Sequence, residues 1–136
     1  MRKTRNAVFD LNFHLVFVTK YRRKVFDDDA LNRLRDQVEE ICGGFNVDLV
    51  EFGGEPDHVH LLINMPPSVS ISKLVNSLKG ATSRILRKER PDLQGKFFNK
   101  NVLWSPSYFA ATTGGVPLEV IKQYVQNQEG GLSSPS

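Results

Sequence analysis

The chain has 136 residues, of which 40% are hydrophobic and 24% are charged. This length and composition are typical of one globular domain and exclude a fibrous or low-complexity chain. The sequence has no apolar run near the roughly 20 residues that a membrane-spanning helix needs, and its basic start lacks a signal-peptide core. The single cysteine, Cys42, excludes an internal disulfide and a multi-cysteine zinc site. We therefore expect a soluble, compact, intracellular protein.

The net charge of +3 is distributed unevenly along the chain. Residues 2–24 hold seven Lys or Arg against one acid, residues 27–57 hold ten acids against two Arg, and residues 73–100 hold eight Lys or Arg against two acids. Two basic blocks around an acidic one indicate a surface that binds a polyanion. Solvated helix faces would give the same pattern, so charge alone leaves both interpretations open.

The N-terminal half predicts a strand, a helix and two further strands. Apolar and polar positions alternate over residues 10–19, which is typical of a strand. A helix is expected over residues 27–44, with an acidic start, Cys42 beside its apolar seam, and a glycine pair at its end. Residues 46–52 and 57–65 are expected to form strands joined by a turn at residues 53–56.

The C-terminal half predicts a second helix over residues 70–90, one or two strands within residues 103–113, and a last helix over residues 117–128. The order β-α-β-β-α-β predicts an α+β fold of the ferredoxin-like, split βαβ type: a mostly antiparallel sheet, two helices packed on one face, and an appended C-terminal helix. The second face of the sheet would then be available for a site. We expect one domain over residues 1–129 and a disordered tail over residues 130–136.

Two histidines lie on the third predicted strand. His58 and His60 are two residues apart, so their side chains point to the same face of the sheet, about 6.6 Å apart along the chain. Two imidazoles at that spacing can bind one divalent cation. Histidines that are only hydrogen-bonded or exposed would show the same pattern, so the pair by itself does not establish a metal site.

The last predicted helix carries Tyr124 and Gln128 on one face, one turn apart. A phenol can act as a nucleophile, and an amide oxygen can bind a metal. A tyrosine that only packs its ring against the sheet is the structural alternative. Tyr21 lies in a basic segment, where contact with a phosphate or a base is more natural. Tyr108 is expected on a strand beside Trp104, as a core or base-stacking residue. Neither tyrosine has a ligand amide one helical turn away.

Taken together, these segments resemble the TnpA-type one-tyrosine HUH transposases of insertion sequences, which act on single-stranded DNA. The resemblance runs from about residue 12 to residue 128. It rests on residues 14–23 (HLVFVTKYRR), 56–62 (PDHVHLL), 78–80 (LKG), 103–108 (LWSPSY) and 121–128 (IKQYVQNQ).

The resemblance implies that Tyr124 attacks DNA and forms a 5′-phosphotyrosine link, and that His58, His60 and Gln128 bind Mg²⁺ or Mn²⁺. A second strand would then attack the link and rejoin the DNA. His14 would support the metal or be a hydrogen-bonded strand residue. The resemblance also implies a prokaryotic, nucleoid-associated protein in the cytoplasm.

The implied partners are single-stranded hairpin ends of an insertion sequence and a second copy of the chain, in a homodimer with composite active sites. Phosphate contacts are expected mainly from basic residues in or near the family-like segments. The candidates are Lys20, Arg22, Arg23, Lys79 and Arg84, with Lys73 and Arg87 beside them.

Three other functions remain open from the sequence. The first is a related HUH tyrosine enzyme, a transposase domesticated by its host and tied to repeated palindromes. The second is a noncatalytic nucleic-acid-binding module on a ferredoxin-like sheet. The third is a metal-dependent hydrolase that uses water, in which Tyr124 is structural.

Overall fold

The computed structural model describes residues 2–3, 8–9, 11–96, 102–113 and 118–127. Its main sheet has four antiparallel strands in the order β4-β5-β3-β6. These strands are β3 (Asn12–Val18), β4 (Asp48–Glu55), β5 (His58–Asn64) and β6 (Phe109–Thr112). Two short strands, β1 (Arg2–Lys3) and β2 (Val8–Phe9), pair separately. The expected split βαβ fold is therefore confirmed; the tail predicted over residues 130–136 lies outside the described residues.

Three α-helices accompany the sheet, with bounds close to those expected: α1 (Asp28–Gly44), α2 (Ile71–Glu89) and α3 (Leu118–Asn127). The carboxylate of Asp27 caps α1 by accepting from the backbone N–H of Ala30, and the hydroxyl of Ser70 caps α2 by accepting from Lys73. Two 3₁₀ turns, η1 (Lys20–Arg22) and η2 (Pro91–Lys96), follow β3 and α2. No helix within the described ranges is both long and apolar enough to cross a membrane.

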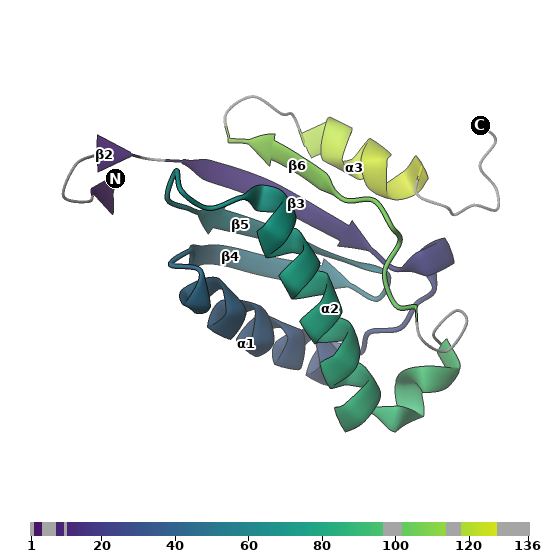
Figure 1. Ribbon diagram of the computed structural model, residues 1–136. Coiled ribbons are helices and arrows are strands. Elements are labelled where there is room, and N and C mark those ends of the chain that lie inside the picture. Colours follow the sequence, from purple (N-terminus) through teal and green to yellow (C-terminus); the bar gives the residue numbers. More distant parts are fainter. Residues whose placement is uncertain (1, 4–7, 10, 97–101, 114–117, 128–136) are drawn as a thin grey trace.

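The helices lie on opposite faces of the sheet (Figure 1). On one face, α1 and α2 bury alternate side chains of the two central strands. These are Leu15 and Phe17 of β3 and Val59, Leu61 and Ile63 of β5. On the other face, α3 packs Val125 against Val16 and Val18 of β3, which forms a second, smaller cluster. The appended helix thus covers only part of this second face.

One expectation about local structure was wrong. Gly53 and Gly54, expected in a turn, belong to β4, and the chain turns instead at Pro56 and Asp57. The region 103–113, expected to hold one or two strands, holds one strand of the sheet, β6, over residues 109–112. The earlier part of that region runs past the end of β3, where the N–H of Ser105 donates to the carbonyl of Val18, before Pro106 interrupts the pairing because proline has no N–H.

Candidate functional site

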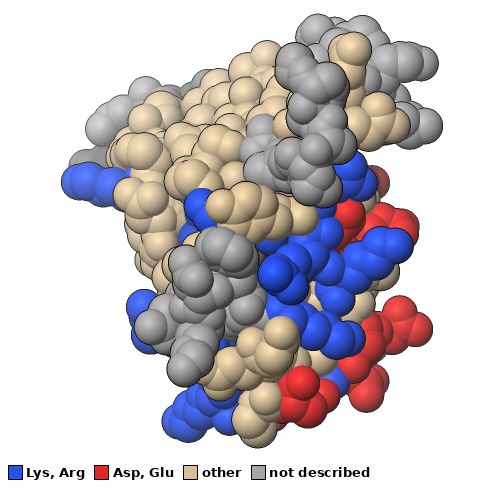
Figure 2. Space-filling model, turned by 90° about the vertical axis from the view of Figure 1, so that its right-hand side faces the viewer, with Lys and Arg blue, Asp and Glu red and all other residues tan. Residues whose placement is uncertain are grey.

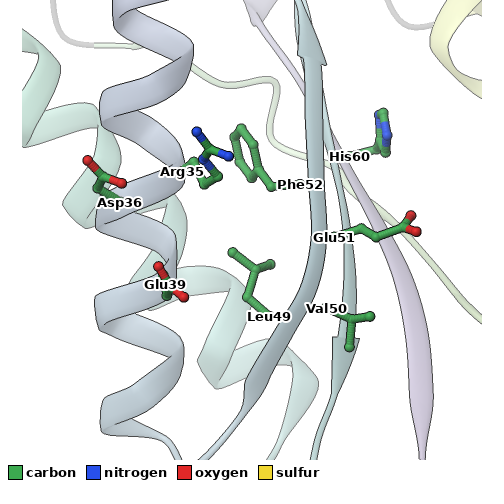
Figure 3. A pocket seen from close by; sticks show the side chains of 8 residues that line it. All are labelled: Arg35, Asp36, Glu39, Leu49, Val50, Glu51, Phe52 and His60. Carbon is green, nitrogen blue, oxygen red and sulfur yellow. The ribbon is translucent and has the colours of Figure 1, made fainter.

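The histidine pair lies on the sheet face that α1 and α2 do not cover. In the strand register, His58 lies between Glu55 of β4 and Val18 of β3. His60 lies between Gly53 of β4 and Val16 of β3. Figure 3 shows His60 and Glu51 turned to the same side of the sheet, away from α1, in a cavity of about 500 Å³ at the β4 edge. The expectation that both imidazoles share one face is met by this register.

Gly53 leaves room for the His60 imidazole beside the backbone of β4. A Cβ atom on Gly53 would lie 2.5 Å from Cε1 and 2.6 Å from Nε2 of His60, closer than two such atoms can approach. Glycine therefore lets the ring lie directly against the backbone of β4. Sequence reasoning missed this role, because Gly53-Gly54 before a proline is equally typical of a turn.

A second cavity, of about 530 Å³, opens over the two histidines. It lies between the open sheet face and α3, which contributes Val125 and Gln126 to its wall. The sheet contributes titratable side chains from three strands: His14, Glu51, Glu55, His58 and His60. His14, expected to support a metal, is therefore in the same cavity as the pair.

The buried carboxylate of Asp57 contacts the ring of His58. Asp57 is 7% exposed, its Oδ1 lies 2.8 Å from Nδ1 of His58, and its Oδ2 accepts from Nε of Arg22 at 3.2 Å. Burial disfavours the charged form of Asp57, but the hydrogen bond and charge of His58 together with Arg22 outweigh it and lower the pKa of the carboxyl group. Asp57 is thus an ionised acceptor at neutral pH. The sequence analysis did not single it out, although it directly precedes His58.

His60 is held in its neutral form. Burial lowers its pKa first, and the nearby His58 and His14 lower it further, against the opposing effect of Glu51 and Glu55. A neutral imidazole is the form that binds a metal. Two imidazoles with carboxylates alongside suit a divalent cation. Within the described part of the chain, no three His, Cys, Asp or Glu side chains already form a metal-binding group, so a further ligand is needed, and Gln128 lies outside the described residues.

Tyr124 shares this face of the sheet but is directed elsewhere. Its hydroxyl lies 3.0 Å from that of Ser107, and its ring packs on Phe109 of β6 with centroids 5.4 Å apart. The described residues of α3 that line the histidine cavity are Val125 and Gln126. In this single chain, Val125 and Gln126 of α3 therefore face the histidine cavity, whereas the Tyr124 side chain lies toward β6.

The other two tyrosines occupy different surroundings. Tyr21 is 44% exposed in η1, where Nζ of Lys20 lies 5.4 Å from its ring centroid. Tyr108 is half-buried against the main core just before β6, so it is not itself on a strand as expected. Trp104 is a core residue that packs on Phe17 and Phe26 and donates to the hydroxyl of Thr82.

The candidate phosphate-binding residues differ in availability. Arg23 and Arg84 are exposed, and Arg22 pairs with Asp57. Lys79 is half-buried and donates to the carbonyls of Ser105 at 2.7 Å and Ser107 at 3.0 Å; burial lowers its pKa to about 8. Lys79, a candidate phosphate contact, thus ties α2 to the segment before β6.

Basic side chains gather on one end of the molecule. Figure 2 shows Lys and Arg across the middle of this face and Asp and Glu along one edge. This end carries η1 and the C-terminal end of α2, as the right-hand side of Figure 1 shows. Basic and acidic side chains are thus separated in the folded protein as they are along the sequence. The basic side chains lie near the start of β5, at His58.

Comparison with known proteins identifies the class to which this fold and site belong. A crystal structure described as a transposase from Deinococcus radiodurans superimposes with a TM-score of 0.86 at 35% identity over 94% of this chain and 98% of that one. A REP-associated tyrosine transposase bound to a REP hairpin matches with a TM-score of 0.58 over 93% of this chain and 70% of that one. At 12% identity, this second match shows the fold alone.

The sequence comparisons agree. The model of the family "Transposase IS200 like" matches residues 7–128. The ISDra2 transposase TnpA of Deinococcus radiodurans is 33% identical over 94% of this chain and 91% of its own length. The transposase of insertion sequence IS200 from Salmonella typhimurium is 30% identical over 88% of this chain and 78% of its own length. The chain belongs to the IS200-like transposase family.

Proposed function

We propose that this transposase cleaves and rejoins single-stranded DNA at the ends of its insertion sequence, with Tyr124 as the nucleophile. The observation that carries the proposal is the position of α3. The helix that bears Tyr124 packs across the same sheet face as His58 and His60, and it forms one wall of the cavity over them. A structural tyrosine would not require this proximity to a histidine pair.

The chemistry exchanges one ester for another. The Tyr124 oxygen attacks the scissile phosphorus as its phenol loses a proton, the bond from phosphorus to the 3′ oxygen breaks, and the 3′ oxygen leaves as a hydroxyl. The products are a 5′-phosphotyrosine and a free 3′-OH. Attack by the 3′-OH of a second strand restores a phosphodiester and returns the proton to Tyr124. Because the number of ester bonds is conserved, no nucleotide is consumed.

The residues proposed to hold Mg²⁺ or Mn²⁺ are His58, His60 and Gln128, with His14 in support. A bound divalent cation would supply Lewis-acid stabilisation of charge on the phosphate and the departing oxygen. The chain's own contribution is to hold both imidazoles on one face and to lower the pKa of His60, which favours its neutral form. The lowered pKa of His60 and the packing of its ring against Gly53 support this assignment.

The direction of the Tyr124 hydroxyl supports a homodimer with composite sites. In one chain the hydroxyl meets Ser107 rather than the histidine cavity, so α3 must move before Tyr124 can act there. Movement of α3 to the histidine pair of a second copy of the chain would bring the Tyr124 hydroxyl to such a cavity. The segment that joins β6 to α3, residues 114–117, lies outside the described residues.

The proposed substrate is a hairpin end with an adjoining single strand, bound in the cytoplasm at the nucleoid. The Lys and Arg side chains across the middle of the face in Figure 2 support phosphate contacts at this end of the molecule. Arg23 and Arg84, both exposed, are the simplest phosphate ligands, with Lys20 beside them. The REP-associated tyrosine transposase shares the fold and binds a hairpin, which is consistent with this class of ligand.

The decisive experiment asks which residue carries DNA. The protein is incubated with single-stranded element ends and Mn²⁺, and the covalent product is digested and read by mass spectrometry. We expect DNA on Tyr124 and no adduct from Tyr124→Phe. Tyr21→Phe and Tyr108→Phe are the matched controls and should retain the adduct. An undiminished adduct from Tyr124→Phe would refute the assignment, and cleavage without any adduct would favour a hydrolase that uses water.

A further inference from the structure

Three side chains form a continuous chain of contacts behind the histidine pair. The Asp57 carboxylate uses one oxygen toward Nδ1 of His58, at 2.8 Å, and the other toward Nε of Arg22, at 3.2 Å. The side chains of Asp57 and His58 are 11% and 19% exposed. The contact between Asp57 and His58 is therefore largely shielded from bulk water, which strengthens a charge-assisted hydrogen bond, whereas the Arg22 side chain is 33% exposed.

The contact determines which imidazole nitrogen carries the proton. An ionised carboxylate can only accept, so Nδ1 of His58 must be the donor. In a neutral imidazole the other nitrogen, Nε2, then keeps its lone pair. Since the His58 ring also lines the cavity, Nε2 is the nitrogen left for a ligand there.

The backbone of the loop that carries Arg22 has an unusual conformation, which places Arg22 beside Asp57. Tyr21 and Arg22 both have positive φ angles, 56° and 53°, in the left-handed region that side chains other than glycine seldom adopt. Such conformations are strained, and they persist where the surroundings impose them.

Thr19 imposes the conformation of this loop. Its carbonyl accepts from the N–H of Arg22 at 2.9 Å, and its hydroxyl lies 2.7 Å from the carbonyl of Arg23 and 3.1 Å from that of Asp57. The N–H of Thr19 also donates to the carbonyl of Asp57 at 2.9 Å. The loop after β3 and the turn before β5 are therefore fixed to each other, with Arg22 facing Asp57.

We propose that Asp57 is a positioning residue that holds His58 as the Nδ1–H tautomer with Nε2 available to the cavity, and that Arg22 fixes Asp57 for this purpose. Arg22 also approaches the carbonyl of Gln126, 3.4 Å from its Nη1, near the C-terminal end of α3, where a cation is favourable. The same pair thus joins the histidine to the helix that carries Tyr124. The part of this inference that concerns metal binding rests on the proposed function, in which His58 is a metal ligand.

The first test needs no variant and no metal. Nitrogen-15 NMR of the metal-free protein reports the protonation of each His58 ring nitrogen at a pH where the ring is neutral. We expect the Nδ1–H tautomer to predominate for His58. A predominant Nε2–H tautomer overturns the inference, whatever the protein's activity.

The second test compares two variants that remove the same charge. Asp57→Asn removes the carboxylate that contacts His58, and Glu40→Gln removes an exposed carboxylate of α1, outside the histidine cavity. Mn²⁺ affinity is measured by titration calorimetry, with circular dichroism and thermal melting to verify folding. We expect Asp57→Asn to weaken Mn²⁺ binding about 10- to 100-fold, and Glu40→Gln to weaken it less than about threefold.

The outcomes separate the two proposals. Equal losses in the two variants would attribute the effect to charge alone and overturn the positioning role. An unchanged His58 tautomer in folded Asp57→Ala, which leaves no side-chain acceptor at this position, would overturn it as well. If the wild-type protein bound no Mn²⁺, the metal part of the proposed function would fail, while the tautomer measurements would still decide the role of Asp57.

Discussion

The two faces of the main sheet have opposite chemistry although the same strands supply both. On β5, Val59, Leu61 and Ile63 are at most 2% exposed beneath α1 and α2. His58 and His60 alternate with them and face the cavity beside α3. Because side chains alternate strictly along a strand, a shift of one residue would exchange the core for the site. The covered face therefore fixes the register on which the open face depends.

The sharpest test of this division compares neighbouring residues. His60→Ala should reduce DNA cleavage on the order of a thousandfold, since a metal ligand supplies several kcal/mol of charge stabilisation. It should change the free energy of unfolding by less than about 1 kcal/mol, because surface substitutions cost little. Leu61→Ala should instead lower the free energy of unfolding by about 2–5 kcal/mol.

These values are measured by urea titration and by cleavage of a single-stranded element end below the unfolding transition. Folded Leu61→Ala should retain cleavage within about tenfold of the wild type. Equal loss of cleavage in the two variants, with both folded, would contradict the functional separation of the faces.

Gly53→Ala tests whether the close packing of the His60 ring on β4 matters for metal binding. The added methyl group would lie within 2.6 Å of the His60 ring, so the imidazole must move. We expect Mn²⁺ affinity to fall about tenfold or more and stability to fall by about 1–3 kcal/mol. Gly43→Ala is the control: it has open space around its Cβ in α1 and should stabilise the protein by about 0.5–1 kcal/mol. Unchanged Mn²⁺ affinity in Gly53→Ala would show that the ring position is unimportant.

Lys79 tests the electrostatics of the covered side. Its pKa is lowered to about 8 by burial, against 10.5 for the ordinary side chain. Between these pH values the unfolded chain binds more protons at Lys79 than the folded one, so the free energy of unfolding should rise with pH. Partial solvent exposure reduces the expected gain to about 1–2 kcal/mol.

The measurement is the difference in unfolding free energy between wild type and Lys79→Met from pH 7 to pH 10.5, which cancels the titration of other groups. The difference should shift in favour of the wild type as pH rises. A flat difference would mean that Lys79 keeps its ordinary pKa.

Ser107→Ala gives the smallest expected effect and concerns the contact that directs Tyr124 to β6. Removing one hydroxyl–hydroxyl hydrogen bond should cost at most about 1 kcal/mol of stability. If this bond must break before Tyr124 acts, the single-turnover rate of adduct formation should increase by up to about fivefold. Ser107→Thr, which keeps the hydroxyl, should stay near the wild-type rate. A slower Ser107→Ala would instead indicate that Ser107 assists the nucleophile.

Much of the fold could be predicted because it depends on local patterns. The alternation on β3 and β5 and the caps at Asp27 and Ser70 place the strands and helices within a few residues of the observed bounds. The errors occurred at Gly53-Gly54, where two glycines are compatible with either a turn or a strand. The choice depends on His60, seven residues away and on the next strand.

The sequence by itself determined the order of elements, the shared face of His58 and His60, and the resemblance to the transposase family, because strand alternation and motif order are properties of neighbouring residues. The tertiary structure decided that Asp57 lies behind His58, that Gly53 makes room for His60, and that the Tyr124 hydroxyl meets Ser107. The contacts of Gly53 and Tyr124 join different elements, and the tie from Asp57 to Arg22 bridges two loops. No local pattern encodes such contacts, since they exist only after the whole sheet has paired.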